Sequence, residues 1–276
     1  MRLKYYHYGV RSGLKRVKTK VAIGLSTAAL GAGALGLTLG MVPGLARADS
    51  QNVNFEPSTY TLGNINGQDG WTKTGAYDAA VSANTSGSSS FGTQSLRISD
   101  AVTSGSFGDQ TFAKPLTDSA GETASTNGTF SAGTKQSYFV TQFDIASATP
   151  STYHTGMHTS VSPDRGDGSR MSYLRFEDNA GGIDVFFDDV QGTGTPANFV
   201  ETKIATLDRS VPHNVKLAMH FINGPSNDVV QVWIDGALVH TGTSWENYYL
   251  YDAEASAEQS PRIVKTYCSV KAARLT

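Results

Sequence analysis

Residues 229–240 read VVQVWIDGALVH, and this stretch decides the fold. Two apolar runs flank Asp235-Gly236, and an Asp-Gly pair in that setting favours a type I′ turn, whose two central residues both adopt positive φ. A two-residue turn fixes the pairs across it: Ile234 with Ala237, Trp233 with Leu238 and Val232 with Val239. The stretch therefore predicts a β-hairpin.

A period-two alternation of apolar and polar residues recurs along the rest of the chain. Four segments show it: 137–145, 172–177, 183–188 and 214–222. Successive side chains of a strand point to opposite faces, so each segment is expected to be a strand with one face in the core. Gly-, Ser- and Thr-rich stretches at 82–93 and 119–134 are expected to be surface loops. Many short strands without helical periodicity predict an all-β fold of two stacked antiparallel sheets.

The first 48 residues differ in composition from the rest. They hold eight basic residues and no acidic one, and no charge lies between Val21 and Ala46. Ala46-Arg47-Ala48 then supplies small residues at the −3 and −1 positions of a cleavage site. We therefore expect residues 1–48 to be a signal peptide and residues 49–276 to be a single secreted, extracellular β-sandwich domain. The apolar run is also long enough to span a bilayer, so a retained anchor is the alternative.

Removal of this segment changes the charge of the protein. The whole chain has a net charge of −2, whereas residues 49–276 keep 14 basic residues against 24 acidic ones, a net charge of −10. Such a charge disfavours nucleic acid and anionic membrane surfaces as partners. Cys268 is the only cysteine, so no disulfide can form within the chain. We expect a monomer that has no membrane contact after signal cleavage.

Two segments resemble a known fold family. Residues 55–57 and 62–71, which read FEP and LGNINGQDGW, resemble the opening strand region of secreted bacterial sandwich domains. Residues 211–217 followed by the hairpin resemble the late strands of concanavalin A-like and laminin-G-like jelly-roll domains. The resemblance implies a two-sheet antiparallel jelly roll whose concave sheet often holds carbohydrate. It implies no single function, because the fold hosts lectins, glycosidases, lyases and adhesion modules.

Calcium is the metal that this resemblance implies, as a structural ion. Residues 164–168, which read DRGDG, and Asp188-Asp189 offer the oxygen ligands that calcium prefers. His154 and His158 would lie about 13 Å apart on a continuous strand, too far to share one metal ion. We interpret these two as ordinary surface histidines, and the metal ligands stay unassigned.

The catalytic strings of the fold family are missing from this chain. Its glycosidases carry two carboxylates in an E-x-D-x-x-E strand, and no such string occurs. The nearest carboxylates, on strands expected to be adjacent, are Glu177, Asp178, Asp184, Asp188 and Asp189. Residues 175–177 match half of the R-x-E-x-R string of alginate lyases, but residue 179 is Asn and the Q-[IV]-H string is absent. We therefore name no catalytic residue.

A candidate carbohydrate site combines a polar strand face with late aromatic residues. Arg175 and Glu177 alternate with the apolar Leu174 and Phe176, so they point away from the core. Residues 245–251, which read WENYYLY, are the most aromatic stretch of the domain. Aromatic rings with polar neighbours suit carbohydrate, although such rings also plug the ends of sandwich cores. The predicted carbohydrate-binding residues are Tyr173, Arg175, Glu177, Trp245 and Tyr248.

Two functions stay open at this point. The first is a non-catalytic carbohydrate-binding or adhesion-type domain whose partner is an extracellular glycan or cell-surface polysaccharide. The second is a secreted polysaccharide-cleaving enzyme, a glycoside hydrolase or polysaccharide lyase, of the same jelly-roll superfamily. The missing catalytic strings favour the first.

The signal peptide gives a first testable prediction. Protein exported by a bacterial host should begin at Asp49, because the small residues Ala46 and Ala48 meet the requirement of a signal peptidase. N-terminal sequencing of the culture medium checks this. Intact residues 1–48 in a membrane fraction would instead establish the anchor.

Overall fold

The computed structural model describes residues 3–6, 50–73, 78–99, 111–115, 138–155, 157–164, 171–191, 198–222, 224, 226–248 and 267–274. The first strands are β1 (Leu3–Tyr6), β2 (Ser50–Val53), β3 (Gly63–Asn64), β4 (Thr72–Lys73), β5 (Asp78–Ala83), β6 (Gln94–Ser99), β7 (Thr111–Pro115) and β8 (Tyr138–Ile145). The later strands are β9 (Met157–Asp164), β10 (Leu174–Asn179), β11 (Gly182–Gln191), β12 (Asn198–Leu207), β13 (His213–His220), β14 (Val229–Ile234), β15 (Ala237–Gly242) and β16 (Tyr267–Arg274). A single 3-10 turn, η1 (Ser89–Phe91), is the only helix of the described residues, and none of their helices could cross a membrane.

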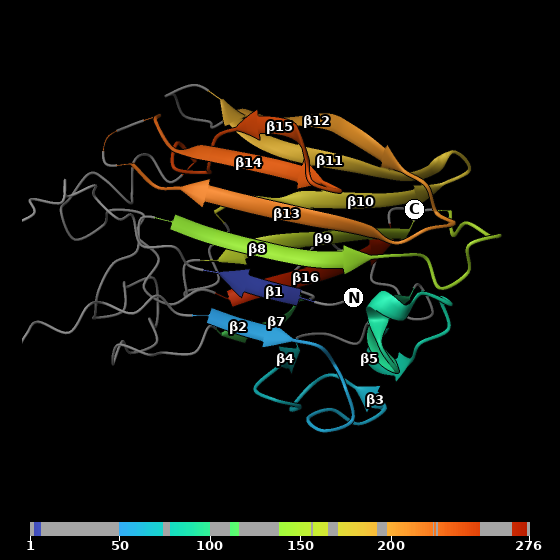
Figure 1. Ribbon diagram of the computed structural model, residues 1–276. Coiled ribbons are helices and arrows are strands. Elements are labelled where there is room, and N and C mark those ends of the chain that lie inside the picture. Colours follow the sequence, from blue (N-terminus) through green and yellow to red (C-terminus); the bar gives the residue numbers. More distant parts are fainter. Residues whose placement is uncertain are drawn as a thin grey trace, which may run out of the picture.

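Two sheets stack face to face, as Figure 1 shows. One sheet, here the front sheet, has the strand order β15-β14-β13-β8-β1-β2. The other, the back sheet, has the order β12-β11-β10-β9-β16-β7-β4. The strand pairs of both sheets are antiparallel. This arrangement confirms the predicted all-β, two-sheet antiparallel sandwich.

The alternation in the sequence matches the burial of the side chains. Leu174 and Phe176 of β10 are buried in the core, and so are the apolar residues at alternate positions of β8, β11 and β13. Phe143 of the front sheet meets Phe176 of the back sheet edge to face, with ring centroids 6.0 Å apart. The interior is therefore built by the residues that the period-two pattern selects.

The opening segment, residues 55–71, forms one end of this core. Phe55 and Trp71 are fully buried, with ring centroids 6.0 Å apart, and Trp71 packs on Phe112 of β7 at 5.8 Å. The indole Nε1 of Trp71 donates a 3.2 Å hydrogen bond to the hydroxyl of Tyr60, which in turn donates to Asp69. The residues that carry the family resemblance here thus pack the core.

The hairpin prediction is confirmed at its turn and at the pair Trp233 with Leu238, and it is wrong at the third pair. Asp235 and Gly236 have φ of 51° and 83°, as a type I′ turn requires, and Ile234 pairs with Ala237. Val232, however, pairs with His240 instead of Val239, because the register shifts between Val232 and Trp233. An inserted residue of this kind is a β-bulge, and the turn sequence carries no signal for it.

Two parts of the chain add to the predicted architecture. The strands β3, β5 and β6 form a third, three-stranded sheet, which Figure 1 shows beside one end of the sandwich. The strand β1 belongs to the segment predicted to be a signal peptide, and it pairs with β8 on one side and β2 on the other. Cleavage before Asp49 stays a prediction, and it would remove β1 from its place between those strands. The loop predicted at 119–134 lies outside the described residues.

The turn generates a prediction on stability. Gly236→Val should lower the free energy of unfolding by about 1–3 kcal/mol, because a β-branched residue resists positive φ. A Cβ at this position would meet nothing within 4 Å, so the loss would come from backbone strain alone. Urea unfolding measures it.

Gly236→Asn is the matched control, because Asn tolerates the left-handed region far better than Val. The free energy of unfolding of the Asn variant should stay close to that of the parent protein. Equal losses in the two variants would contradict the turn assignment.

Candidate functional site

The back sheet carries a polar row on its outer face, the side turned away from the front sheet. The Cα register places Glu177 of β10 opposite His158 of β9 and opposite Asp184 of β11. It places Asp188 of β11 opposite Glu201 of β12. Because alternate residues share a face, Arg175 and Phe186 lie in the same row. We call this set, with Lys203 of β12, the polar row.

Arg175 lies at the centre of the polar row and is held on three sides. Its Nε and Nη2 donate to the two carboxylate oxygens of Glu201 at 2.6 and 2.7 Å, and its Nη1 donates to Glu177 at 2.7 Å. Its guanidinium carbon lies 4.0 Å from the centroid of the Phe186 ring. Although burial opposes the charge, the hydrogen bonds that Arg175 donates to both glutamates raise its pKa above the usual range. The guanidinium is therefore a fixed, planar and permanently charged group.

The carboxylates of the row differ in their proton affinity. The hydrogen bond from Arg175 lowers the pKa of Glu177. Burial alone would raise the pKa of Asp184, but hydrogen bonds from Lys203 and Thr206 lower it. At Asp188, burial and then the charge of Glu201 raise the pKa to about 6. At neutral pH the row thus holds ionised carboxylates beside one that titrates near pH 6.

His158 departs from its predicted role as a surface histidine. Its side chain is buried on β9, and its Nε2 lies 3.4 Å from Oε2 of Glu177. Burial, followed by the charge of Arg175, lowers the pKa of His158. No local pattern predicts this burial, because no alternation of apolar and polar residues surrounds His158. His158 belongs to the polar row instead.

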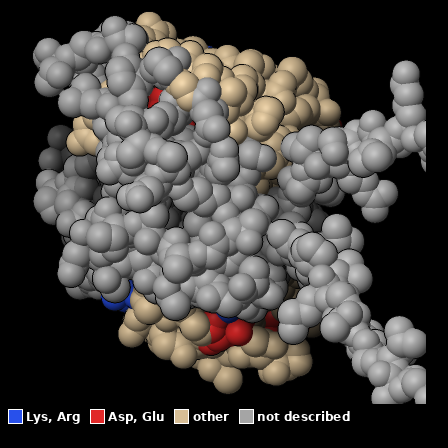
Figure 2. Space-filling view, turned by 90° about the vertical axis from the view of Figure 1, so that its left-hand side faces the viewer, with Lys and Arg blue, Asp and Glu red and all other residues tan. Residues whose placement is uncertain are grey.

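Beside the polar row, aromatic rings gather over the ends of β11 and β12. Tyr173 and Trp245 are 4% and 9% exposed and pack on Val190, with ring centroids 6.1 Å apart. Phe199 of β12 and Tyr248 are 43% and 47% exposed, and both rings contact Trp245, at 5.0 and 6.2 Å. These four rings are the aromatic cluster. Figure 2 looks onto the end of the sandwich at which β15 finishes, and the upper part of the described surface there is almost wholly uncharged.

Asp188 links the aromatic cluster to the polar row. Its main-chain carbonyl accepts a 3.0 Å hydrogen bond from Nε1 of Trp245, and its main-chain N–H donates to the carbonyl of Tyr173 at 3.3 Å. Its carboxylate, on the outer face, lies in the row beside Glu201. The structure thus brings all five residues of the predicted site to one side of the back sheet.

Their exposure differs from what a sugar-stacking role would need. Trp245 is buried in a small cluster with Tyr173 and Val190, separate from the sandwich core, where it supports other rings. Tyr248 presents an open ring face instead. Phe199, which the sequence reasoning missed, presents a second one. Carbohydrate binding by the five predicted residues remains a prediction.

A buried polar lock fixes the segment that carries Trp245 and Tyr248. Asp228 is 2% exposed and accepts hydrogen bonds from the hydroxyl of Ser244 at 2.6 Å and from the N–H of Ile222 at 2.7 Å. The N–H of Asp228 donates to the buried Glu246 at 3.2 Å. Burial raises the pKa of Asp228 to about 7, and the nearby charge of Glu246 acts in the same direction. The segment is therefore anchored by hydrogen bonds on both sides of Trp245.

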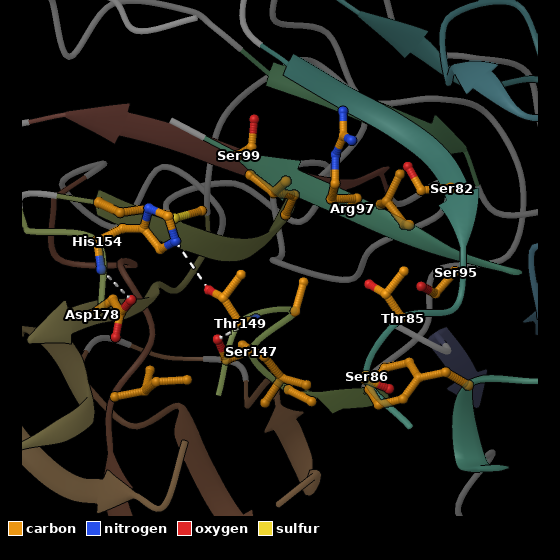
Figure 3. A pocket seen from close by; sticks show the side chains of 18 of the residues that line it. Ser82, Thr85, Ser86, Ser95, Arg97, Ser99, Ser147, Thr149, His154 and Asp178 are labelled. Carbon is orange, nitrogen blue, oxygen red and sulfur yellow. Dashed lines mark hydrogen bonds between the residues drawn. The ribbon is translucent and has the colours of Figure 1, made fainter. Parts of the chain in front are cut away.

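A cavity of about 440 Å³ lies on the other side of β10, between the third sheet and residues 145–149. Figure 3 shows its serine and threonine hydroxyls, with His154 hydrogen-bonded to Thr149 and Asp178. Phe176 and Ile183 of the core form part of its wall. Asp178 is already engaged by Arg209 at 2.6 Å. The polar row, which lies beside the exposed rings of Phe199 and Tyr248, is the stronger candidate site.

The calcium expectation is untested. No three His, Cys, Asp or Glu side chains gather closely enough to hold a metal ion within the described ranges. Residues 165–168 of the proposed DRGDG ligand set lie outside those ranges. Asp189, of the second proposed set, accepts a 2.8 Å hydrogen bond from the N–H of Thr243. Calcium binding stays a prediction.

Comparison with protein-family models and with curated protein sequences finds no match. Among solved structures, similar ones include a mutant of the alginate lyase Aly36B in complex with an alginate tetrasaccharide, at 14% identity over 75% of this chain and 98% of that chain, with a TM-score of 0.28. An endo-1,3-β-glucanase from Streptomyces sioyaensis is 12% identical over 75% of this chain and 87% of that chain, also with a TM-score of 0.28. Likeness this weak assigns no role to any residue here.

The polar lock generates a prediction on pH dependence. A carboxyl whose pKa is raised by folding destabilises the folded state as pH rises from about 4 to about 7, because the unfolded chain releases that proton first. Asp228→Asn removes this effect: its Oδ1 can still accept from the N–H of Ile222, and its Nδ2 can donate to the hydroxyl of Ser244. Relative to the parent, the variant should gain about 2–3 kcal/mol of unfolding free energy between pH 5 and pH 8.

Urea unfolding of both proteins at the two pH values measures this difference. The comparison cancels the opposite contribution of His158, whose lowered pKa stabilises the folded state as pH rises. Parallel pH profiles would show that Asp228 ionises in the folded protein as it does in the unfolded chain.

Proposed function

We propose that this protein is a non-catalytic carbohydrate-binding domain of the concanavalin A-like jelly-roll type, and that it binds an extracellular glycan on the outer face of the back sheet. The polar row would orient sugar hydroxyls, and the exposed rings of Phe199 and Tyr248 would stack on sugar rings. Tyr173 and Trp245 would support those rings from below. The expected setting is the extracellular space, with a structural calcium ion as a further expectation.

One observation carries the proposal: a rigid row of hydrogen-bonding groups and a pair of exposed rings lie side by side on one sheet face. A sugar offers both hydroxyl edges and an apolar ring face, so it is matched by polar groups next to an aromatic platform. Arg175, Glu177 and Glu201 hold each other in place, so little side-chain entropy is lost on binding. Exposed rings of this kind are also costly on a surface without a ligand.

Cleavage of the glycan is the alternative, and one observation favours it. Asp188 titrates near pH 6 while Glu177 has a lowered pKa, and both belong to the polar row. Carboxyls with oppositely shifted pKa values are the groups that glycoside hydrolysis uses. The binding experiment must therefore also measure the length of the glycan after incubation.

The proposal predicts that exposed rings contribute to affinity. After a glycan array identifies a ligand, Tyr248→Ala and Phe199→Ala should each weaken binding by roughly 2- to 12-fold, the range expected for one aromatic contact. Isothermal titration with the soluble glycan measures this. Longer chains should bind more tightly than short ones, because they reach both rings.

Leu238→Ala is the matched control, since Leu238 is an exposed apolar residue of the front sheet, 52% exposed. It should leave affinity unchanged. Binding that neither ring variant weakens would move the site elsewhere. A rise in reducing ends during incubation would show that the protein is an enzyme.

A further inference from the structure

We infer that the polar row selects glycans that carry no anionic group and rejects uronate polymers. This inference rests on the proposed function and names the class of glycan that the same site takes. It follows from the ion pairs that the cations of the row already form with carboxylates of the same row.

Three of the five N–H donors of Arg175 are already used, and its Nε/Nη2 edge is occupied by a carboxylate. Its Nε, Nη1 and Nη2 all donate to Glu177 or Glu201 at 2.6 to 2.7 Å, and Phe186 covers one face of the guanidinium. To pair with Arg175 through Nε and Nη2, a uronate would have to displace Glu201, which already forms a bidentate pair there. Displacement would leave Glu201 unpaired beside Asp188, its Cα partner on β11.

The second cation of the row is also paired. Nζ of Lys203 lies 2.7 Å from Oδ1 of Asp184, which further accepts a hydrogen bond from Thr206. Four carboxylates therefore face two permanent cations among the described side chains of this row: Glu177, Asp184, Asp188 and Glu201 against Arg175 and Lys203. The local excess of negative charge has the same sign as the net charge of −10 of residues 49–276. Both repel a polyanion.

A neutral sugar is not repelled by these carboxylates and can donate hydrogen bonds to them. Ionised carboxylates accept hydrogen bonds and cannot donate them, so Glu177, Asp184 and Glu201 suit ligands that donate hydroxyl hydrogens. A hydroxyl-rich uncharged glycan thus finds acceptors and no opposing charge.

The test compares a neutral gluco-oligosaccharide with a uronate oligosaccharide of the same length, by isothermal titration at low and moderate salt. The parent protein should bind the neutral ligand at least about 10-fold more tightly, with little dependence on salt, because the uronate meets like charge. Glu201→Gln should then gain affinity for the uronate, by about 5-fold or more at low salt, because Arg175 regains a free edge. Glu177→Gln should act in the same direction and serves as the second variant if Glu201→Gln folds poorly.

Asp144→Asn is the matched control. It changes the net charge by the same amount, but Asp144 lies on β8 of the front sheet, where it accepts a hydrogen bond from Asn214. It should leave the preference unchanged. A parent protein that binds the uronate as tightly as the neutral ligand overturns the inference while the proposed function stands. Folded glutamine variants that gain no uronate affinity also overturn it, whereas a protein that binds no glycan on the array fails the proposed function itself.

Discussion

Burial of Leu174 and Phe176 on β10 determines where the charged residues of the candidate site lie. Both side chains fill the space between the sheets, and a strand sends alternate residues to opposite faces. Arg175 and Glu177 must therefore leave the core together. The same rule on β11 buries Val185 and Phe187 and brings Phe186 out beneath the guanidinium. A one-residue slip of β10 would bury both Arg175 and Glu177, so the core protects the register of the site.

The polar row is stable because its charges are shared across strands. Arg175 joins Glu177 of its own strand to Glu201 of β12 across the intervening strand β11, so three backbone segments depend on one guanidinium. Its side chain is only 13% exposed, and a largely buried cation of this kind is stable only with partners. Burial and the charge of Glu201 raise the pKa of Asp188, whereas the hydrogen bond from Arg175 lowers the pKa of Glu177. The same ion pairs thus link the strands and set the pKa values of the row.

Much of the sandwich could be predicted from the sequence because local rules govern it. Alternation identified β8, β10, β11 and β13, and Asp235-Gly236 identified the turn, since both signals arise from the backbone itself. The strand β12 was missed because it is an edge strand with mostly exposed side chains, so large apolar residues do not alternate along it. Its Phe199 and Glu201, which complete the site, were missed with it. The burial of His158 and Trp245 depends on neighbours from distant segments, and no local pattern encodes such neighbours.

The position of the aromatic cluster follows from a close approach between the edges of the two sheets. At Gly242 the last residue of β15 passes β11 so closely that a Cβ would lie 2.4 Å from Oδ1 of Asp189 and 2.7 Å from the Phe187 ring. Glycine is therefore required there, and the next residue, Thr243, donates its N–H to Asp189. The chain thus leaves the front sheet and is fastened to the back sheet within two residues, so Trp245 reaches the main chain of Asp188 and Met171. The segment that follows the hairpin therefore places the rings of Trp245 and Tyr248 beside the polar row.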